Sequence, residues 1–227
     1  MPRRAPRSTP SSFGSVKAAP PAVRPGQRIG LLGGSFNPPH AGHALISRIA
    51  LTRLGLDQVW WIVTPGNPLK SRSELAPLAE RVLASQAVAR HPRIRATAFE
   101  RHLPATFTAV TLTFLKRRAR GVHFVWLMGA DNLASFDRWQ HWREIAEMMP
   151  IAVIDRPGWR LSAVASRAGR ALARYRIPES RARLLPGMDP PAWVFLTGPL
   201  SPLSSTELRL QRAAKTASAD TIRRSKD

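Results

Sequence analysis

The chain has 227 residues, of which 44% are hydrophobic, and a chain of this length can bury one substantial core. It contains no cysteine, which excludes disulfides and thiolate metal sites, and no apolar run reaches the roughly 20 residues of a membrane helix. The basic start has no apolar segment typical of a secretory signal, so we expect a cytoplasmic protein without a membrane partner.

The formal net charge of +21 is shared between the two ends and the body of the chain. Residues 1–28 carry six basic side chains and no acidic one, residues 209–227 carry a net +4, and the body keeps +11. A body this basic favours anionic partners, either nucleic acid or polyphosphate metabolites. Residues 1–27 lack apolar periodicity and predict a disordered basic tail, and residues 213–227 predict a second tail that frays. We therefore expect one domain over residues 28–212.

The body alternates short apolar runs with helical patterns. This alternation predicts an α/β fold, a single Rossmann-like domain with a parallel sheet and helices on both faces. In such a sheet a ligand lies outside the carboxyl ends of the strands, so the loops there are where site residues are expected. The expected strands are Ile29–Gly33, Val59–Thr64, Ile94–Thr97, Val122–Met128, Ile151–Ile154 and Trp193–Thr197, and the expected helices are Ala41–Leu54, Glu74–Arg90, Thr108–Arg120, Trp139–Met148 and Ser162–Arg174, with a last helix from Ser204 or Ser205.

The first expected strand is followed by the sequence GGSFNPPHAGH, which leads into a helix. The paired glycines, Gly33 and Gly34, let the backbone approach a phosphate closely, and Ser35 adds a hydroxyl. His40 and His43 are three residues apart and share a face at the helix start, where free N–H groups favour an anion. A zinc pair is the alternative, but His-x-x-His without nearby carboxylates or cysteines is a poor metal site, so we predict no metal ligand set.

This loop resembles the phosphate-binding signature of the nucleotidyltransferase superfamily, HxGH after a Gly-Gly-Thr-Phe-Asp-Pro-like turn. Ser35 stands where Thr is usual and Asn37 where Asp is usual, and both replacements stay polar. The absence of GxxxxGK[ST] excludes a P-loop fold, and the absence of GxGxxG disfavours a dinucleotide-binding dehydrogenase. The resemblance implies catalytic roles for both histidines and ATP binding by Gly33, Gly34, Ser35, Phe36, His40 and His43.

Further segments resemble the bacterial nicotinate-nucleotide adenylyltransferases of that superfamily. Thr106–Leu112 is similar to their (S/T)YTxxTL, Gly129–Trp142 to GxDxLxxxxxWxxxxxI and Asp155–Trp159 to (R/P)RPGY, while an NPxK-like run ends at Lys70. The likeness extends over residues 28–212. It implies transfer of the adenylyl group of ATP to nicotinate mononucleotide, which yields deamido-NAD and pyrophosphate in NAD biosynthesis.

The resemblance also implies how the acceptor nucleotide is held. Trp139 can stack on the pyridinium ring by cation–π attraction, with core packing as the alternative; Trp60, Trp61 and Trp126 are better core candidates. In the family the nicotinate carboxylate receives two backbone N–H groups, and Asp131 is expected near the ATP ribose, with a helix cap as the alternative. The N–H donors correspond to Thr108 and Gln140, and further candidates for substrate contacts are Lys70 and Arg156.

The last expected strand leads into a second phosphate-binding segment. Ser204 with Glu207 fits a helix capping box, which leaves Ser205 and Arg209 unexplained on one face of the helix. A hydroxyl and a guanidinium there form a clamp for a polyphosphate. The segment resembles the ISSTxIR motif of the same superfamily, which implies that Ser205 and Arg209 hold the β- and γ-phosphates of ATP.

By resemblance, the phosphate of nicotinate mononucleotide attacks the α-phosphorus of ATP in line and requires no general base. Mg²⁺ is expected to bridge the ATP phosphates, held by substrate oxygens and water. Two alternatives stay open: an adenylyltransferase for nicotinamide mononucleotide or phosphopantetheine, and a non-catalytic basic nucleic-acid-binding protein. The chain has no RNA-binding signature, so we expect no specific nucleic-acid partner. The oligomeric state cannot be read from the sequence.

Overall fold

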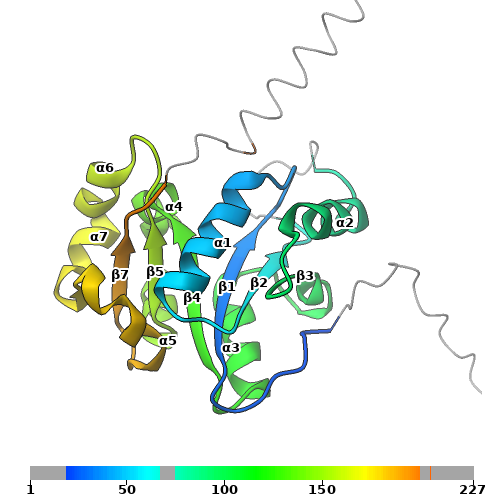
Figure 1. Cartoon of the computed structure of the whole chain (residues 1–227), viewed down its shortest axis with the longest axis horizontal. Helices are drawn as coiled ribbons and strands as arrows, with labels where there is room; N and C mark the ends of the chain where they lie inside the picture. The colour runs from blue at the N-terminus through cyan, green and yellow to red at the C-terminus, as the bar shows by residue number, and fades with distance from the viewer. Residues whose placement is uncertain (1–18, 67–74, 200–204, 206–227) are drawn as a thin grey trace, which may run out of the picture.

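The computed structural model of the chain describes residues 19–66, 75–199 and 205. Within these residues seven strands form one parallel sheet in the order β3-β2-β1-β4-β5-β7-β6 (Figure 1). This arrangement confirms the expected α/β fold. The strands are β1 Arg28–Gly34, β2 Gln58–Val63, β3 Ile94–Thr97, β4 His123–Gly129, β5 Ile151–Ile154, β6 Arg176–Ile177 and β7 Trp193–Leu196.

The strand order reverses next to β1, because the chain builds outward to β2 and β3 and then returns to β4 on the other side of β1. Leu31 of β1 pairs with Trp60 of β2 and with Trp126 of β4. In open α/β sheets such a reversal leaves a crevice at the carboxyl ends of the two central strands. The fold therefore places a ligand site after β1 and β4.

The sheet separates two hydrophobic cores (Figure 1). One core contains Trp61, the other contains Trp60 and Trp126, and all three side chains are buried as the sequence predicted. The first core is covered by α1 Ala41–Arg53, α2 Leu78–Ala89 and the 3-10 helix η4 Glu179–Gly187. The second is covered by α3 Thr108–Arg118, α4 Ala130–Ala134, α5 Trp142–Met148, α6 Arg160–Ala165 and α7 Arg167–Ala171, with the 3-10 helices η1 Phe99–His102, η2 Phe136–Arg138 and η3 Ala173–Tyr175 between them.

Three expected helices are clearly shorter or broken. The helix expected from Glu74 to Arg90 begins at Leu78 as α2. The helix expected from Trp139 begins at Trp142, because His141 has a left-handed backbone with φ of 59°. The helix expected from Ser162 to Arg174 breaks at Ser166, whose extended backbone ends α6 and whose hydroxyl accepts the N–H of Gly169 to cap α7. The two-residue strand β6 and the helix η4 have no counterpart in the sequence-based expectation.

Part of the predicted amino-terminal tail contacts the domain. Val23 packs against the second core, and the N–H of Gly26 donates to the carbonyl of Gly121 at 2.7 Å. The carbonyl of Gln27 accepts the N–H of His123 at 2.8 Å. Residues 1–18 of that tail, and the second predicted tail, lie outside the described residues.

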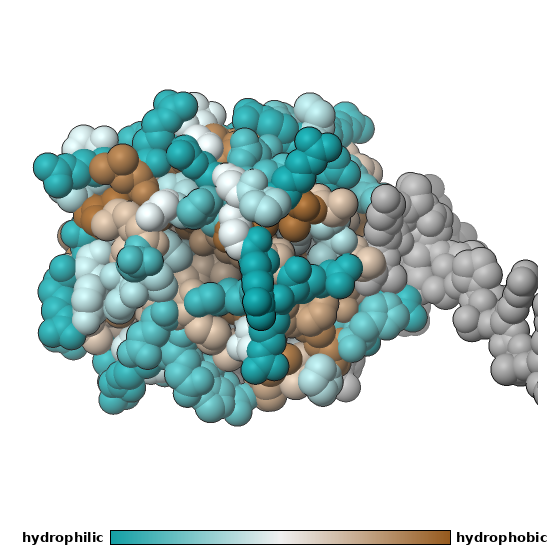
Figure 2. Space-filling model, turned by 90° about the horizontal axis from the view of Figure 1, so that it is seen from below, coloured by the Kyte–Doolittle hydropathy of each residue, from teal (hydrophilic) through white to brown (hydrophobic). Residues whose placement is uncertain are grey.

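The surface below the sheet in Figure 1 lies toward the amino ends of its strands, and Figure 2 shows this face covered mostly by hydrophilic side chains, with apolar ones in separate patches. Scattered apolar side chains are ordinary on a protein surface. No helix in the described ranges is long and apolar enough to cross a membrane.

Candidate active site

A cavity of about 440 Å³ lies at the carboxyl ends of β1, β2 and β4. The loops after these strands and the starts of α1 and α3 form its walls. Lys70 and Arg209 lie outside the described residues. Every other predicted site residue lines this one cavity: Gly33, Gly34, Ser35, Phe36, His40, His43, Thr108, Asp131, Trp139, Gln140, Arg156 and Ser205.

The two histidines form a reciprocal cap at the start of α1. Nδ1 of His40 accepts the N–H of Gly42 at 3.1 Å, and the N–H of His40 donates to Nδ1 of His43 at 3.2 Å. The ring centroids are 3.9 Å apart. Because each Nδ1 accepts a backbone proton, each neutral ring carries its own proton on Nε2. The cap therefore sets the imidazoles up as hydrogen-bond donors at a helix end that already favours anions.

The surroundings of His43 keep its ring neutral at neutral pH. Burial, followed by electrostatic repulsion from His40 and Arg156, lowers the pKa of His43 to about 3. The ring packs against Phe36, at a centroid distance of 4.6 Å, and against Trp61 at 5.8 Å. A neutral imidazole can still donate its Nε2–H to a phosphate oxygen, and a bound anion would favour the charged form again.

A buried arginine ties together the loops that follow β1 and β2. Arg81 of α2 is only 2% exposed, and its guanidinium donates to the carbonyls of Ser35 at 2.7 Å, Thr64 at 2.8 Å and Pro65 at 3.3 Å. A fourth bond, to Ala76, measures 2.8 Å. None of the acidic side chains in the described ranges forms an ion pair with Arg81, and burial lowers its pKa. The loop at Ser35 is thus held from behind by a cation.

Asp131 and Arg156 meet across the mouth of the cavity. Nη1 of Arg156 lies 3.7 Å from Oδ2 of Asp131, while Oδ1 of Asp131 is buried and accepts no hydrogen bond from the described residues. A Cβ at Gly129 would lie 2.3 Å from that Oδ1 and 2.9 Å from Cδ of Arg156, so only glycine leaves room for both side chains. A carboxylate that lines a polar cavity can accept the hydroxyl donors of a ribose.

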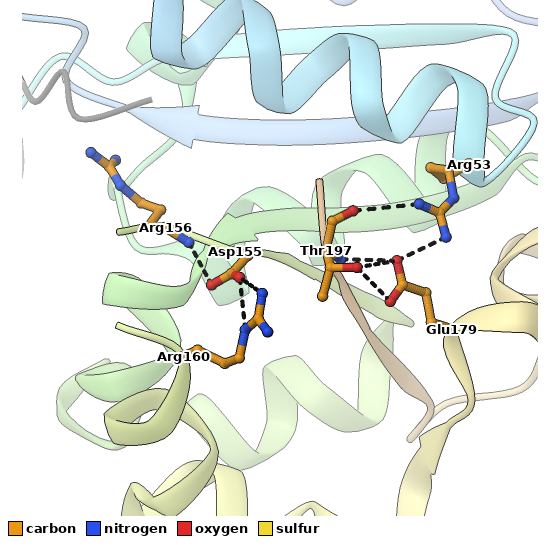
Figure 3. A network of polar contacts seen from close by, with 6 residues as sticks. All are labelled: Arg53, Asp155, Arg156, Arg160, Glu179 and Thr197. Atoms are coloured by element: carbon orange, nitrogen blue, oxygen red, sulfur yellow. Dashed lines mark hydrogen bonds and ion pairs between the residues drawn. The ribbon is translucent and has the colours of Figure 1, made fainter. Parts of the chain in front are cut away.

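The loop after β5 is fastened by Asp155, which is 6% exposed. Its carboxylate accepts the backbone N–H of Arg156 at 2.9 Å and Nε of Arg160 at 2.8 Å (Figure 3). The side chain of Arg156 points away from this cluster in Figure 3. Asp155 therefore fixes the backbone from which Arg156 reaches the cavity wall.

A second cluster fastens the end of β7. Glu179 accepts the N–H of Thr197 at 2.9 Å and a hydrogen bond from Nη2 of Arg53 at 2.8 Å. These contacts join η4, β7 and the last turn of α1 (Figure 3).

Further along the chain, the hydroxyl of Ser205 donates to the carbonyl of Pro38 at 2.9 Å. Ser205 thereby lies against the first loop, which brings the two predicted phosphate segments together despite a separation of 167 positions.

The other end of the cavity combines an aromatic wall with an open helix start. Trp139 is held edge-on by Phe136 and by Trp126, at centroid distances of 5.4 and 6.3 Å. Phe107, the N-cap of α3, has no side-chain acceptor, so the first amides of the helix, beginning with Thr108, are left for a ligand. A flat ring with a carboxylate matches this combination.

Several residues of the cavity wall were not predicted from the sequence: Thr64, Glu100, Thr106, Asn132 and Arg138. Thr64 and Asn132 follow the carboxyl ends of β2 and β4, so the rule that located the other residues could have found them.

Gly33 has an additional role, because a Cβ there would lie 2.6 Å from Cη2 of Trp126. This glycine makes room for a core tryptophan as well as for a ligand.

The comparisons with known proteins agree with this geometry. The model of the cytidylyltransferase-like family matches residues 31–211. The "Probable nicotinate-nucleotide adenylyltransferase" of Agrobacterium fabrum is 60% identical over 181 residues, which are 80% of this chain and 97% of the relative. Its namesake in Mesorhizobium japonicum is 57% identical over 83% of this chain and 97% of the relative. The chain belongs to the nicotinate-nucleotide adenylyltransferase family.

A solved structure supports the fold assignment. The Plasmodium falciparum nicotinic acid mononucleotide adenylyltransferase complexed with NaAD superposes with a TM-score of 0.61 at 19% identity, over 81% of this chain and 82% of that one. At this identity the match shows the shared architecture alone. Within the family, the roles of the individual cavity residues in this chain stay predictions.

Proposed function

We propose that this chain transfers the adenylyl group of ATP to nicotinate mononucleotide and releases pyrophosphate, a step of NAD biosynthesis in the cytoplasm. The proposal rests on one observation. A single cavity has a hydrogen-bond-donor end and an aromatic end. His40 and His43 offer N–H donors at one helix start, and Trp139 lies beside a second open helix start at Thr108. A dinucleotide product needs a polyphosphate site and an aromatic site in one continuous space.

In this scheme the protein promotes the reaction mainly by positioning the acceptor phosphate against ATP. The phosphate of nicotinate mononucleotide is already an anion, so its oxygen can attack the α-phosphorus of ATP without a general base. One P–O bond forms, the bond from the α-phosphorus to the bridging oxygen breaks, and pyrophosphate leaves with the electron pair. Nε2–H of His43, with His40 beside it, stabilises the charge that builds on the α- and β-phosphate oxygens.

The remaining roles extend the same scheme. Ser205 and Arg209 hold the β- and γ-phosphates, and Gly33, Gly34, Ser35 and Phe36 shape the loop around them. Asp131 accepts the ribose hydroxyls through its carboxylate, which lines the cavity. Lys70 and Arg156 supply further positive charge near the phosphates.

A divalent cation, Mg²⁺, accompanies ATP in this proposal. The described residues contain no group of three or more His, Asp or Glu side chains that could cage a metal ion. The cavity would therefore suit an ion held mainly by phosphate oxygens and water. When bound, the ion neutralises developing charge on the phosphates, while the protein orients the groups that react.

The decisive experiment measures pyrophosphate release with three acceptors: nicotinate mononucleotide, nicotinamide mononucleotide and phosphopantetheine. Backbone N–H groups of Thr108 and Gln140 offer only donors, and a carboxamide presents an NH₂ to one of them. A mismatched buried pair costs about 1–3 kcal/mol, so kcat/KM should favour the acid by roughly ten- to several-hundred-fold. Equal use of acid and amide would contradict this pocket.

Trp139→Ala provides an internal control for that experiment. Stacking on the pyridinium ring does not involve the carboxylate. The variant should therefore lower kcat/KM for the acid and the amide by similar factors and leave the ratio of the two values unchanged. Binding of nucleic acid with steep salt dependence and no pyrophosphate release would instead favour the non-catalytic alternative.

A further inference from the structure

One buried carboxyl in the cavity wall, that of Glu100, has no part in the scheme above. It lies on η1, only 5% of it is exposed, and it faces the same cavity as Thr64 and Thr108. Acidic side chains are rarely this buried unless they are paired. In the described part of the chain Glu100 forms no ion pair.

The two carboxyl oxygens of Glu100 differ in their hydrogen bonds. Oε1 accepts the hydroxyl of Thr111 at 2.5 Å. The hydroxyl of Thr64 also lies beside the carboxyl, but it donates its proton to the carbonyl of Gly66 at 3.0 Å. Oε2 is buried and accepts no hydrogen bond from any described residue. A buried oxygen in this position favours a carboxyl that carries a proton.

The bond to Thr111 reaches the helix start that faces the nicotinate end. Thr111 is fully buried, and it follows Thr108 by three residues on the same face of α3. The N-cap, Phe107, has no side chain that could fix the first turn. The contact between Glu100 and Thr111 therefore anchors the first turn of α3 to η1.

We propose that Glu100 is a positioning and specificity-determining residue: through Thr111 it holds the amide of Thr108 where a nicotinate carboxylate binds. The proposal rests on the proposed function, because it assumes a nicotinate ring against Trp139. It assigns Glu100 no contact with the reacting atoms.

The charge of Glu100 matters because the start of a helix is its positive end. An ionised carboxyl there would compete with the carboxylate of the substrate, whereas a neutral one does not. Burial raises the pKa of Glu100, and the hydroxyl of Thr111 offsets part of that rise. Other charged groups on neighbouring elements are Arg101 and His102 on η1, Lys116, Arg117 and Arg118 in the last turn of α3, and Arg81, which binds the carbonyl of Thr64.

The test compares four variants of the full-length enzyme: Thr111→Val, Thr111→Ser, Glu100→Gln and Thr113→Val. Thr113 is the matched control, because its hydroxyl bonds to the carbonyl of Ala109 within α3 and to Met148 rather than to η1. Pyrophosphate release is measured with nicotinate and nicotinamide mononucleotides at several pH values, together with the melting temperature of each variant.

Thr111→Val should lower kcat/KM for the acid about tenfold, mainly through KM, and that for the amide by no more than about twofold. Thr111→Ser keeps the hydroxyl and Thr113→Val leaves the anchor intact, so both should keep the wild-type ratio of acid to amide. Glu100→Gln keeps an acceptor for Thr111 and cannot ionise. In the wild type, acid kcat/KM should decline as rising pH ionises Glu100. Glu100→Gln should retain the preference for the acid and lose that decline.

An equal loss for acid and amide in Thr111→Val, or a lowered melting temperature with an unchanged ratio, would overturn the proposal and leave Glu100 a structural residue. A Glu100→Gln variant that discriminates as poorly as Thr111→Val would overturn it as well. Failure of the proposed function is distinguishable, because the wild type itself would then release no pyrophosphate with nicotinate mononucleotide.

Discussion

The backbone N–H of His40 donates to Nδ1 of His43, so the helix cap itself determines which nitrogen of His43 carries the proton. The remaining proton on Nε2 is the one that can reach a phosphate oxygen. The same bond fixes the plane of the ring, which lies 3.9 Å from its neighbour. Orientation and tautomer at this position are therefore properties of a local backbone turn.

Replacing His43 tests its role in the chemical step. His43→Ala should lower kcat by on the order of 10²–10³ with a much smaller effect on KM, because a donor aimed at developing charge acts mainly in the transition state. His123→Ala is the matched control, since this exposed histidine lies at the opposite ends of the strands. A folded His43→Ala enzyme that keeps more than about a third of wild-type kcat would rule out this role.

The depressed pKa of His43 also predicts how stability depends on pH. The folded-state pKa is about 3 and the reference value is 6.5, so between these values the unfolded chain binds the proton more readily. The stability that the neutral ring of His43 contributes is fully present above pH 6.5 and decreases as the pH falls toward 3. The free energy of unfolding should drop by about 1–2 kcal/mol more in the wild type than in His43→Asn between pH 7 and pH 5. Urea unfolding at both pH values measures the difference, and parallel curves would contradict it.

Arg81 should be the residue of α2 on which the cavity loops depend most. Arg81→Met leaves four carbonyls without their donor and should lower the free energy of unfolding by about 3 kcal/mol or more. It should also raise KM for ATP, because the loop at Ser35 loses its support. Arg90→Met, at the exposed end of the same helix, should change stability by no more than about 0.5 kcal/mol. Equal effects of the two substitutions would show that the hydrogen bonds of Arg81 do not stabilise the fold.

Two truncations locate the start of the folded unit. Deleting residues 1–22 should leave the melting temperature and kcat/KM unchanged within about twofold, as expected for a segment without apolar periodicity. Deleting residues 1–27 should lower the melting temperature, because it also removes the contacts of Val23, Gly26 and Gln27. Identical melting temperatures for the two deletions would mean that these contacts are not stabilising.

Local patterns were sufficient to predict most of the sheet and the residues that end its strands. His40 and His43 could be placed together because three residues along a helix bring side chains onto one face. The break at His141 could not be predicted, because the left-handed backbone of a histidine depends on the packing around it. Trp139 consequently lies on an extended backbone before α5, and its predicted place beside the ligand did not require a helix.

Long-range polar contacts were beyond local patterns. Arg81 meets a carbonyl 46 positions earlier, and Glu100 meets a hydroxyl on the next helix, 11 positions later. Neither contact has a periodicity or a motif of its own. Only the folded chain shows that both side chains are buried and that Glu100 lines the cavity.

The chain enters the sheet at the amino ends of its strands and leaves it at their carboxyl ends, and this has a practical consequence. Residues 23–27 approach at the amino ends of β1 and β4, whereas β7 carries the chain toward Ser205 at the cavity. A fluorescent protein or a surface linker fused ahead of residue 23 would sit far from the opening through which nucleotides enter. The same addition close behind Ser205 would crowd that opening. Biosensors or immobilised catalysts made from this enzyme are therefore best anchored through the amino-terminal side.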